Sequence, residues 1–424
     1  MGRLRRSLAV LLALFAAVPV AGAASPSGVR QSRSAAPLGA HAASPAPTTA
    51  LQRRLAKALR VPHVSPARSA AIAVDLGNGS VLFAQNGSRP LAPASNEKLP
   101  VTFAALTTLG AAYRYETDVL GEGGQNGTLW EGPIVLKGGG DPTLSSADLR
   151  SLALQVRAGG VRRIVGPIVG DESWYDARRT VAGWKRGFYI NESPPLSALV
   201  VDRDRVGGYV SNSPALAAAT AFRVALRRAG VAVTGAAKVG VADDYAVSLA
   251  SVESAPLAAI IRFMDHESDN FTAEMLLKEL GAIEGGRGTS AAGAAVVTRE
   301  LADAGVPLAG VRIVDGSGLS VLDRLTANAL TSLLRTAWLD PSVRSVLRAA
   351  LPVAGVNGTL EDRMRRGPAH GTVVAKTGTT TEASALSGFV RDRYTFAVLQ
   401  NGHPLSYWWA RVAQDRFAQV LAAQ

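Results

Sequence analysis

The order of the predicted elements restricts the fold of this chain more than any other feature of its sequence. A hairpin predicted at 70–86, around a Gly-Asn-Gly turn, and a helix predicted at 95–110 come first. The chain ends in helices, three strands and a last amphipathic helix, whereas 117–250 is turn-rich, with short strands and helices of its own. We therefore expect an α+β domain formed by 51–116 and 251–424, interrupted by a smaller α/β domain at 117–250.

Length and composition fit this two-domain arrangement. A chain of 424 residues is too long for one ordinary core, and 47% hydrophobic with 18% charged residues is typical of a globular protein. There is no cysteine, which excludes thiol catalysis and cysteine-ligated zinc. The five histidines show no His-Glu-x-x-His spacing, so we predict neither a metal site nor a cofactor.

The first fifty residues have the composition of a targeting segment and a tether. A basic start, a short apolar stretch and small residues ending at Ala23 indicate a secretory signal at 1–23, with a retained membrane anchor as the alternative. Residues 24–50 are rich in Ala, Ser, Pro and Thr, which predicts a disordered linker. We expect an extracytoplasmic protein, in the periplasm or the cell wall.

The charge balance points away from nucleic acid. The formal net charge is +12, and loss of the three signal-segment arginines leaves +9, but the cations are scattered and form no stripe with interleaved aromatics. An anionic polymer outside the membrane is the better expectation. Trp408 and Trp409 could mark a membrane-surface helix. We favour packing against the sheet, because the other face of that helix carries few lysines or arginines, and so expect at most peripheral membrane contact.

The first candidate for chemistry is Ser95-x-x-Lys98. Side chains three apart on a helix lie on one face, so the hydroxyl and the ammonium can touch. A serine becomes a good nucleophile when a neighbouring base takes its proton, and a lysine is such a base only when desolvation or a second cation keeps it neutral. The alternative is a helix cap beside a solvated lysine.

The second candidate is Ser268-Asp269-Asn270, in a turn between two predicted helices. The hydroxyl can relay a proton and the amide can hold a substrate amide. The alternative is an ordinary helix start, since Ser, Asp and Asn are all good caps.

The third candidate is a predicted strand that carries Lys376, Thr377, Gly378 and Thr379. The ammonium and hydroxyl can bind a carboxylate, and the glycine leaves room for a ligand backbone beside the strand. The alternative is an edge strand whose lysine guards against aggregation.

The three candidates together are far more specific than each alone. In the order Ser-x-x-Lys, Ser-x-Asn, Lys-Thr-Gly they are the signature set of penicillin-binding proteins and serine β-lactamases. The sequence most resembles the class C low-molecular-mass penicillin-binding proteins, which are D-alanyl-D-alanine carboxypeptidases and often also endopeptidases. Further segments that look like family blocks are LKGGGDPTL (136–144), GDESWYD (170–176), DGSGLS (315–320) and LPVAGVNGTL (351–360).

The resemblance covers roughly residues 55–420. It implies a β-lactamase/DD-peptidase-like catalytic domain, with an antiparallel sheet flanked by helices, and an inserted domain between the first two motifs. The interval between Ser95 and Ser268 is shorter than in well-known members, which indicates that a further nested domain is missing or reduced.

The resemblance also implies a mechanism on peptidoglycan stem peptides. Ser95 attacks the penultimate D-alanine carbonyl, Lys98 takes its proton, and Ser268 passes a proton to the leaving amine. Lys376 supplies a second positive charge beside Lys98, and Asn270 hydrogen-bonds the peptide. β-Lactams are expected to acylate the same serine as covalent inhibitors.

The substrate's other polar groups have implied partners as well. Lys376 and Thr377 bind the terminal carboxylate, and the N–H groups of Ser95 and Thr379 hold the oxyanion. Two alternatives stay open from the sequence: a serine β-lactamase and a peptidoglycan-binding protein without turnover. No glutamate between the second and third motifs has the pattern of a deacylating β-lactamase residue, which disfavours the former.

Overall fold

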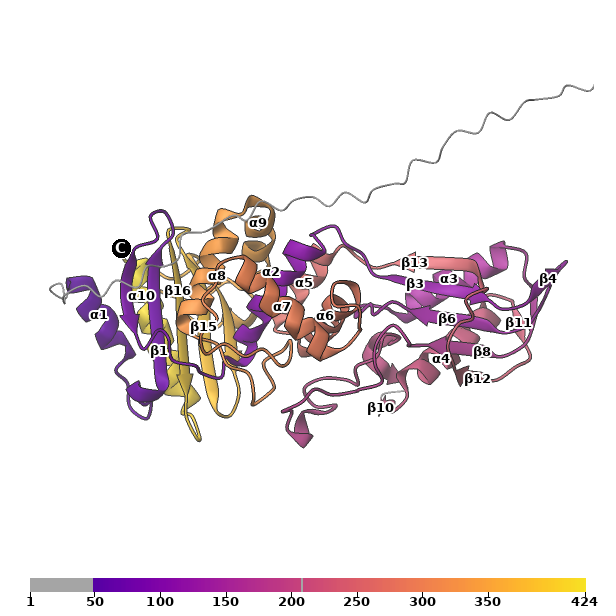
Figure 1. Cartoon of the computed structure of the whole chain (residues 1–424), viewed down its shortest axis with the longest axis horizontal. Helices are drawn as coiled ribbons and strands as arrows, with labels where there is room; N and C mark the ends of the chain where they lie inside the picture. Colours follow the sequence, from indigo (N-terminus) through magenta and orange to yellow (C-terminus); the bar gives the residue numbers. More distant parts are fainter. Residues whose placement is uncertain (1–48, 207–208) are drawn as a thin grey trace, which may run out of the picture. The chain divides into compact units, whose positions relative to one another are not determined.

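The computed structural model describes residues 49–206 and 209–424 (Figure 1). The predicted signal segment 1–23 and nearly all of the predicted linker 24–50 lie outside the described residues and stay predictions. Within the described part, the helices are all too short or too polar to span a bilayer.

A five-stranded antiparallel sheet is built from both ends of the chain. Its order is β14-β15-β16-β1-β2, so the early hairpin joins three late strands. The joint is the pairing of β1 with β16, in which Ile72 lies opposite Ala397. The predicted antiparallel sheet is thus confirmed. Its strands are β1 (Ser69–Asp75), β2 (Val81–Gln85), β14 (Val373–Thr379), β15 (Ala383–Val390) and β16 (Tyr394–Asn401).

Helices cover both faces of this sheet. Alternate side chains of a strand point to opposite faces, and here both sets are apolar and need covering. In β1, Ile72 and Val74 pack into one core, whereas Ala71 and Ala73 pack into another. The second core contains α1 (Ala50–Leu59) and α10 (Tyr407–Ala422). The first contains α2 (Lys98–Thr108), α5 (Leu257–Glu267), α6 (Asn270–Ile283), α7 (Ser290–Asp303), α8 (Ala327–Leu339) and α9 (Pro341–Ala350).

The middle of the chain forms a two-stranded sheet of β9 (Arg205–Val206) and β10 (Tyr209–Val210), and two larger sheets around a separate core that includes Leu152 and Phe222. One sheet has the order β12-β8-β6-β3-β13, with parallel pairing among β6, β8 and β12, and the other has the order β11-β7-β5-β4. This region is α/β in character, as expected for the smaller domain, although its boundaries stay a prediction. Its principal elements are β3 (Glu116–Gly121), β6 (Ile134–Gly138), α3 (Ser146–Ala158), β8 (Ile168–Asp171), α4 (Pro214–Arg228), β12 (Ala237–Val239) and β13 (Val247–Glu253). The shorter strands are β4 (Gly124–Asn126), β5 (Leu129–Glu131), β7 (Arg163–Val165) and β11 (Ala232–Val233).

One predicted helix end is wrong. Gly281 is expected to end α6, but the helix continues to Ile283. A Cβ at position 281 would lie 2.7 Å from the carbonyl oxygens of both Arg287 and Thr289. This glycine therefore serves the close approach of the loop that follows α6, and not the termination of the helix.

Candidate active site

Ser95 lies in a 3-10 turn, Ala94–Glu97, that leads directly into α2. Two glycines from distant segments press on this turn. A Cβ on Gly378 of β14 would lie 3.0 Å from the Ser95 amide nitrogen, and one on Gly318 would collide with the Ala94 carbonyl. The turn is thus held between β14 and the 315–320 segment, which leaves Ser95 little freedom.

Lys98 is wholly buried, so the alternative of a solvated surface lysine is wrong. Its Nζ donates to the Ser95 hydroxyl at 3.1 Å, to Asn270 Oδ1 at 2.9 Å and to the Ser317 carbonyl at 2.9 Å. These three acceptors match the three hydrogens of an ammonium group. Burial lowers the pKa of Lys98 to about 8, although nearby carboxylates act to raise it. About a tenth of the amine is therefore neutral at pH 7.

Lys376 is also wholly buried, although its strand β14 is an edge of the sheet. A lysine that guards an edge against aggregation must reach solvent, so this alternative is wrong as well. The Lys376 Nζ donates to the Ser268 hydroxyl at 2.9 Å. Burial, and next the positive charge of Lys98, lower the pKa of Lys376 to about 7.

The turn between α5 and α6 carries the second motif. Ser268 ends α5 with φ +60°, a left-handed conformation that is uncommon for a non-glycine residue. Asp269 then caps α6 by accepting from the Thr272 amide at 2.8 Å, so part of the cap interpretation holds. Asn270 accepts from Lys98 and donates its Nδ2 to the Glu192 carbonyl at 3.1 Å. The strained turn thus aims one hydroxyl at Lys376 and one amide at Lys98.

A cavity of about 260 Å³ opens beside these groups. It is lined by all the predicted residues except the two lysines, which lie behind it, and by four others that the sequence analysis does not identify. The predicted lining residues are Ser95, Ser268, Asn270, Thr377, Gly378 and Thr379; the additional ones are Glu192, Thr359, Arg363 and Arg411.

Two arginines give this cavity a cationic wall. Arg363 is held by Asp415 at 2.6 Å and by Gln414 at 3.1 Å, and Arg411 lies over the Tyr407 ring at 5.5 Å. The buried Nε of Arg411 has no hydrogen-bond partner among the described residues. Such a wall suits a ligand with a carboxylate. Neither arginine belongs to a local motif, so no pattern in the sequence identifies them as site residues.

Buried carboxyl groups hold the segment that supplies the Ser317 carbonyl. Glu274 Oε1 accepts from the amides of Gly316 at 3.1 Å and Ser317 at 2.8 Å, and Asp315 accepts from Gly318 at 2.7 Å. Burial, and next the charge of Asp315, raise the pKa of Glu274 to about 8. The DGSGLS block is identifiable in the sequence, but the role of its Ser317 carbonyl as a hydrogen-bond acceptor for Lys98 is not.

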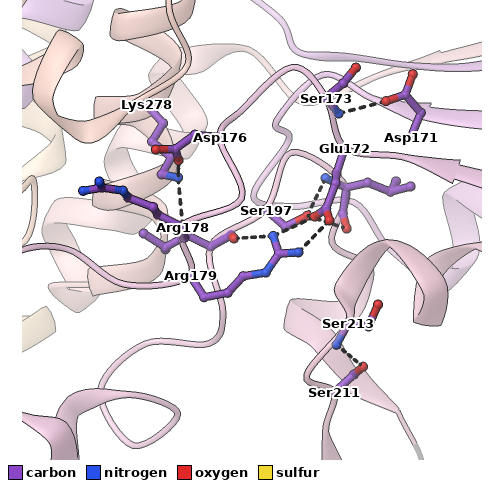
Figure 2. Close-up of polar contacts among 12 residues, drawn as sticks. Asp171, Glu172, Ser173, Asp176, Arg178, Arg179, Ser197, Ser211, Ser213 and Lys278 are labelled. Carbon is purple, nitrogen blue, oxygen red and sulfur yellow. Dashed lines mark hydrogen bonds and ion pairs between the residues drawn. The ribbon is translucent and has the colours of Figure 1, made fainter. Parts of the chain in front are cut away.

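The loop after β8 belongs to the inserted domain and forms ion pairs within that domain and with α6 (Figure 2). Arg179 pairs with both carboxylate oxygens of Glu172, at 2.7 and 2.6 Å, and donates to the Leu196 carbonyl at 3.0 Å. Asp176 of the same loop pairs with Lys278 of α6. Farther along this loop, the carbonyl of Glu192 meets Asn270. The insert therefore contacts both α6, through Asp176, and the Asn270 side chain, through the Glu192 carbonyl.

Comparison with known proteins gives a consistent assignment. Residues 51–212 and 208–424 match the D-Ala-D-Ala carboxypeptidase 3 (S13) family. The chain is 32% identical to the D-alanyl-D-alanine carboxypeptidase of Actinomadura sp. (strain R39), over 85% of this chain and 82% of that protein. It is 33% identical to carboxypeptidase DacB of Mycolicibacterium smegmatis, over 82% of this chain and 78% of that protein.

The fold also has solved counterparts. The crystal structure of penicillin binding protein 4 from Haemophilus influenzae matches with a TM-score of 0.78 at 22% identity, over 88% of this chain and 99% of that one. This likeness confirms the fold that the sequence motifs imply.

Proposed function

The chain belongs to the D-Ala-D-Ala carboxypeptidase 3 (S13) family and is a serine-type D-Ala-D-Ala carboxypeptidase, and we propose that Ser95 is its nucleophile. The observation that carries this proposal is the contact of the Ser95 hydroxyl with a wholly buried lysine whose pKa is lowered to about 8. A neutral Lys98 amine accepts the hydroxyl proton as the oxygen attacks.

The first half of the reaction forms an acyl-enzyme. Ser95 Oγ bonds to the penultimate D-alanine carbonyl carbon, its proton passes to Lys98, and the carbonyl π electrons move to the oxygen. Collapse of this intermediate breaks the C–N bond to the terminal D-alanine, whose nitrogen takes a proton through Ser268. The hydrogen bond between Lys376 and Ser268 supports this relay. Water then hydrolyses the ester and restores Ser95.

The other polar groups of the cavity bind the substrate. The N–H groups of Ser95 and Thr379 take the oxyanion; loss of one such donor typically costs about 10²–10³ in rate. Thr377, with Lys376 behind it, faces the terminal carboxylate, and the arginine wall favours the same charge. Asn270 binds the peptide backbone after its Nδ2 leaves the Glu192 carbonyl.

The substrates are peptidoglycan stem peptides, and β-lactams acylate the same serine. A second crystal structure of the Haemophilus protein is a complex with a β-lactam, with a TM-score of 0.73 at 21% identity over 88% of this chain and 99% of that one. Because such substrates lie outside the cytoplasm, we place the enzyme there, with the predicted signal segment as its export device.

Labelling with a fluorescent penicillin tests the nucleophile. The wild type is expected to carry the label through a denaturing gel, and Ser95→Ala is expected to carry none. Ser88→Ala, seven residues away in the sequence and outside the cavity lining, is the matched control. Labelled Ser95→Ala protein, or an unlabelled wild type, would refute the assignment.

A comparison of product release tests the two alternatives. A carboxypeptidase releases D-alanine from a stem peptide much faster than it turns over nitrocefin, whereas a β-lactamase does the reverse and a binding protein does neither. The glutamates considered as deacylating groups do not line the cavity; they are Glu274, Glu279, Glu284, Glu300 and Glu361.

A further inference from the structure

Cationic side chains gather in a groove between α1 and α10, which we name the basic groove. The two helices pack together on one face of the five-stranded sheet (Figure 1). The groove has a volume of about 1390 Å³ and shares no lining residue with the cavity beside Ser95. Its exposed cations are Arg53, Arg54 and Lys57 of α1, Arg60 directly after that helix, and Arg416 of α10.

The packing of α1 explains why these cations face outward. Leu55, Ala58 and Leu59 are buried in the core shared with Phe417, and their three- and four-residue spacing defines the inner face of the helix. Leu51 and Ala56 border this face and are partly buried, whereas Arg53, Arg54 and Lys57 are exposed. Every charged side chain of α1 is basic, so the helix carries no carboxylate of its own that could pair with these cations.

Three cations of the groove have no acidic partner within the described part of the chain. Arg54, Lys57 and Arg416 form no ion pair with any described residue. Among the described residues that line the groove, the single acidic side chain is that of Asp415, which pairs with Arg363 at 2.6 Å. The groove therefore carries a net positive charge, which favours the binding of an anionic partner.

An exposed tryptophan continues the surface of α10 beyond the groove. Trp408 is 63% exposed, and it precedes Val412 by four residues and Arg416 by eight, so the three lie on one stripe of the helix. The expectation that both tryptophans pack against the sheet is wrong for Trp408, whereas Trp409 packs with Val64. A membrane-surface helix needs cations, and α10 by itself has few. The neighbouring α1 supplies the others.

We propose that the basic groove and Trp408 dock this enzyme on the surface of an anionic phospholipid bilayer. Lysine and arginine near such a surface are attracted by its negative potential, and tryptophan favours the headgroup region. A soluble anionic polymer would satisfy the cations equally well. It would leave the exposed indole of Trp408 and the half-buried Val412 in contact with water. Because the catalytic cavity has separate walls, docking leaves it open.

Vesicle co-sedimentation of the full chain tests the proposal. Vesicles of phosphatidylcholine with about 30% phosphatidylglycerol are expected to bind the wild type, and pure phosphatidylcholine vesicles to bind it much less. The variant R54E/K57E/R416E is expected to bind at least tenfold more weakly. The control R150E/R228E/K238E reverses three exposed cations of the insert and is expected to bind like the wild type. All proteins share the same N-terminal segment, so a difference reports on the groove.

Two further measurements separate the sources of binding. Binding is expected to weaken strongly at about 0.5 M NaCl. Trp408→Ser is expected to weaken it severalfold at either salt concentration, and Tyr245→Ser, at a 91% exposed aromatic of the insert, to leave it unchanged. Penicillin labelling of every variant checks folding without using the groove.

The proposal is overturned if R54E/K57E/R416E binds the anionic vesicles as the wild type does. It is also overturned if the wild type binds soluble poly(glycerol phosphate) but not these vesicles, since the groove would then serve a wall polymer. These outcomes do not bear on Ser95, because the labelling experiment tests that residue independently.

Discussion

Lys98 and Lys376 are both wholly buried, and each holds one of the two serine hydroxyls of the site. The Lys98 Nζ lies 3.1 Å from Ser95 Oγ, and the Lys376 Nζ lies 2.9 Å from Ser268 Oγ. Burial lowers both pKa values, to about 8 and about 7, so near neutral pH the pair readily gives up a proton. A neutral amine next to a serine is what the proposed attack needs.

Acylation by a penicillin is therefore expected to accelerate with pH in two steps, near the pKa values of about 7 and about 8. Lys376→Met removes one amine of the pair. Its acylation rate is then expected to rise in a single step, at higher pH than the first step of the wild type. Lys376→Arg keeps a fixed charge that repels the proton on Lys98, so its step is expected at lower pH than that of Lys376→Met. Stopped-flow acylation rates across the pH range measure this. Identical profiles for both variants would contradict it.

Glu274→Gln is expected to flatten the decline of stability with rising pH. The folded protein raises the pKa of this carboxyl from 4.5 to about 8, so it binds a proton that the unfolded chain has released in this range. The stabilisation that this carboxyl contributes is fully present below its pKa in the unfolded chain, 4.5. It is lost as the pH rises through its pKa in the folded protein, about 8.

Urea unfolding midpoints of the wild type and Glu274→Gln across this range give the measurement. Glu361→Gln, at an exposed position, is the control and is expected to follow the wild type. A Glu274→Gln protein with the same pH dependence as the wild type would contradict the raised pKa.

Gly378→Ala is expected to slow acylation by about 10², because its Cβ would lie 3.0 Å from the Ser95 amide nitrogen and displace the nucleophile. Gly124→Ala is the matched control: it also lies in a strand, and a Cβ there meets nothing within 4 Å. Single-turnover rates with a penicillin compare the two. If Gly378→Ala retains the wild-type rate, the turn around Ser95 is not held by β14.

Lys278→Met is expected to lower the free energy of unfolding by about 3 kcal/mol, because it breaks a largely buried pair and strands Asp176. The Lys278 side chain is 1% exposed and that of Asp176 is 27% exposed. Arg365→Met breaks a pair with Asp362 whose side chains are 65% and 81% exposed, and a loss under about 1 kcal/mol is expected. Chemical unfolding measures both, and equal losses would show that burial does not govern these pairs.

Much of this fold and site is predictable from local sequence. Hydrophobic periodicity, or turn and capping residues at the ends, identifies three kinds of element. These are the hairpin around the Gly-Asn-Gly turn, the strand carrying Lys376 and the helices on either side of Ser268. The three motifs also identify the residues that converge on one cavity. Gly281 was misjudged because a packing glycine and a terminating glycine look alike in one dimension.

The second layer of the site was not predictable in this way. Ser317 contributes a main-chain carbonyl, which every residue possesses, so no side-chain pattern indicates it. Arg363 and Arg411 reach the cavity from unrelated segments, and only tertiary packing brings them together. The basic groove has the same origin: the sequence analysis of α10 alone finds too few cations, because the missing ones precede it by more than three hundred positions.

The pairing of β1 with β16 determines when the enzyme can fold. The two strands come from opposite ends of the chain, and β14, which delivers Lys376, is attached to the sheet only through β15 and β16. The reaction centre therefore cannot assemble before β16 has been synthesised and paired with β1. Long-range pairing of this kind is slow. A partly made or truncated copy is thus unable to cut its substrate or to capture a penicillin.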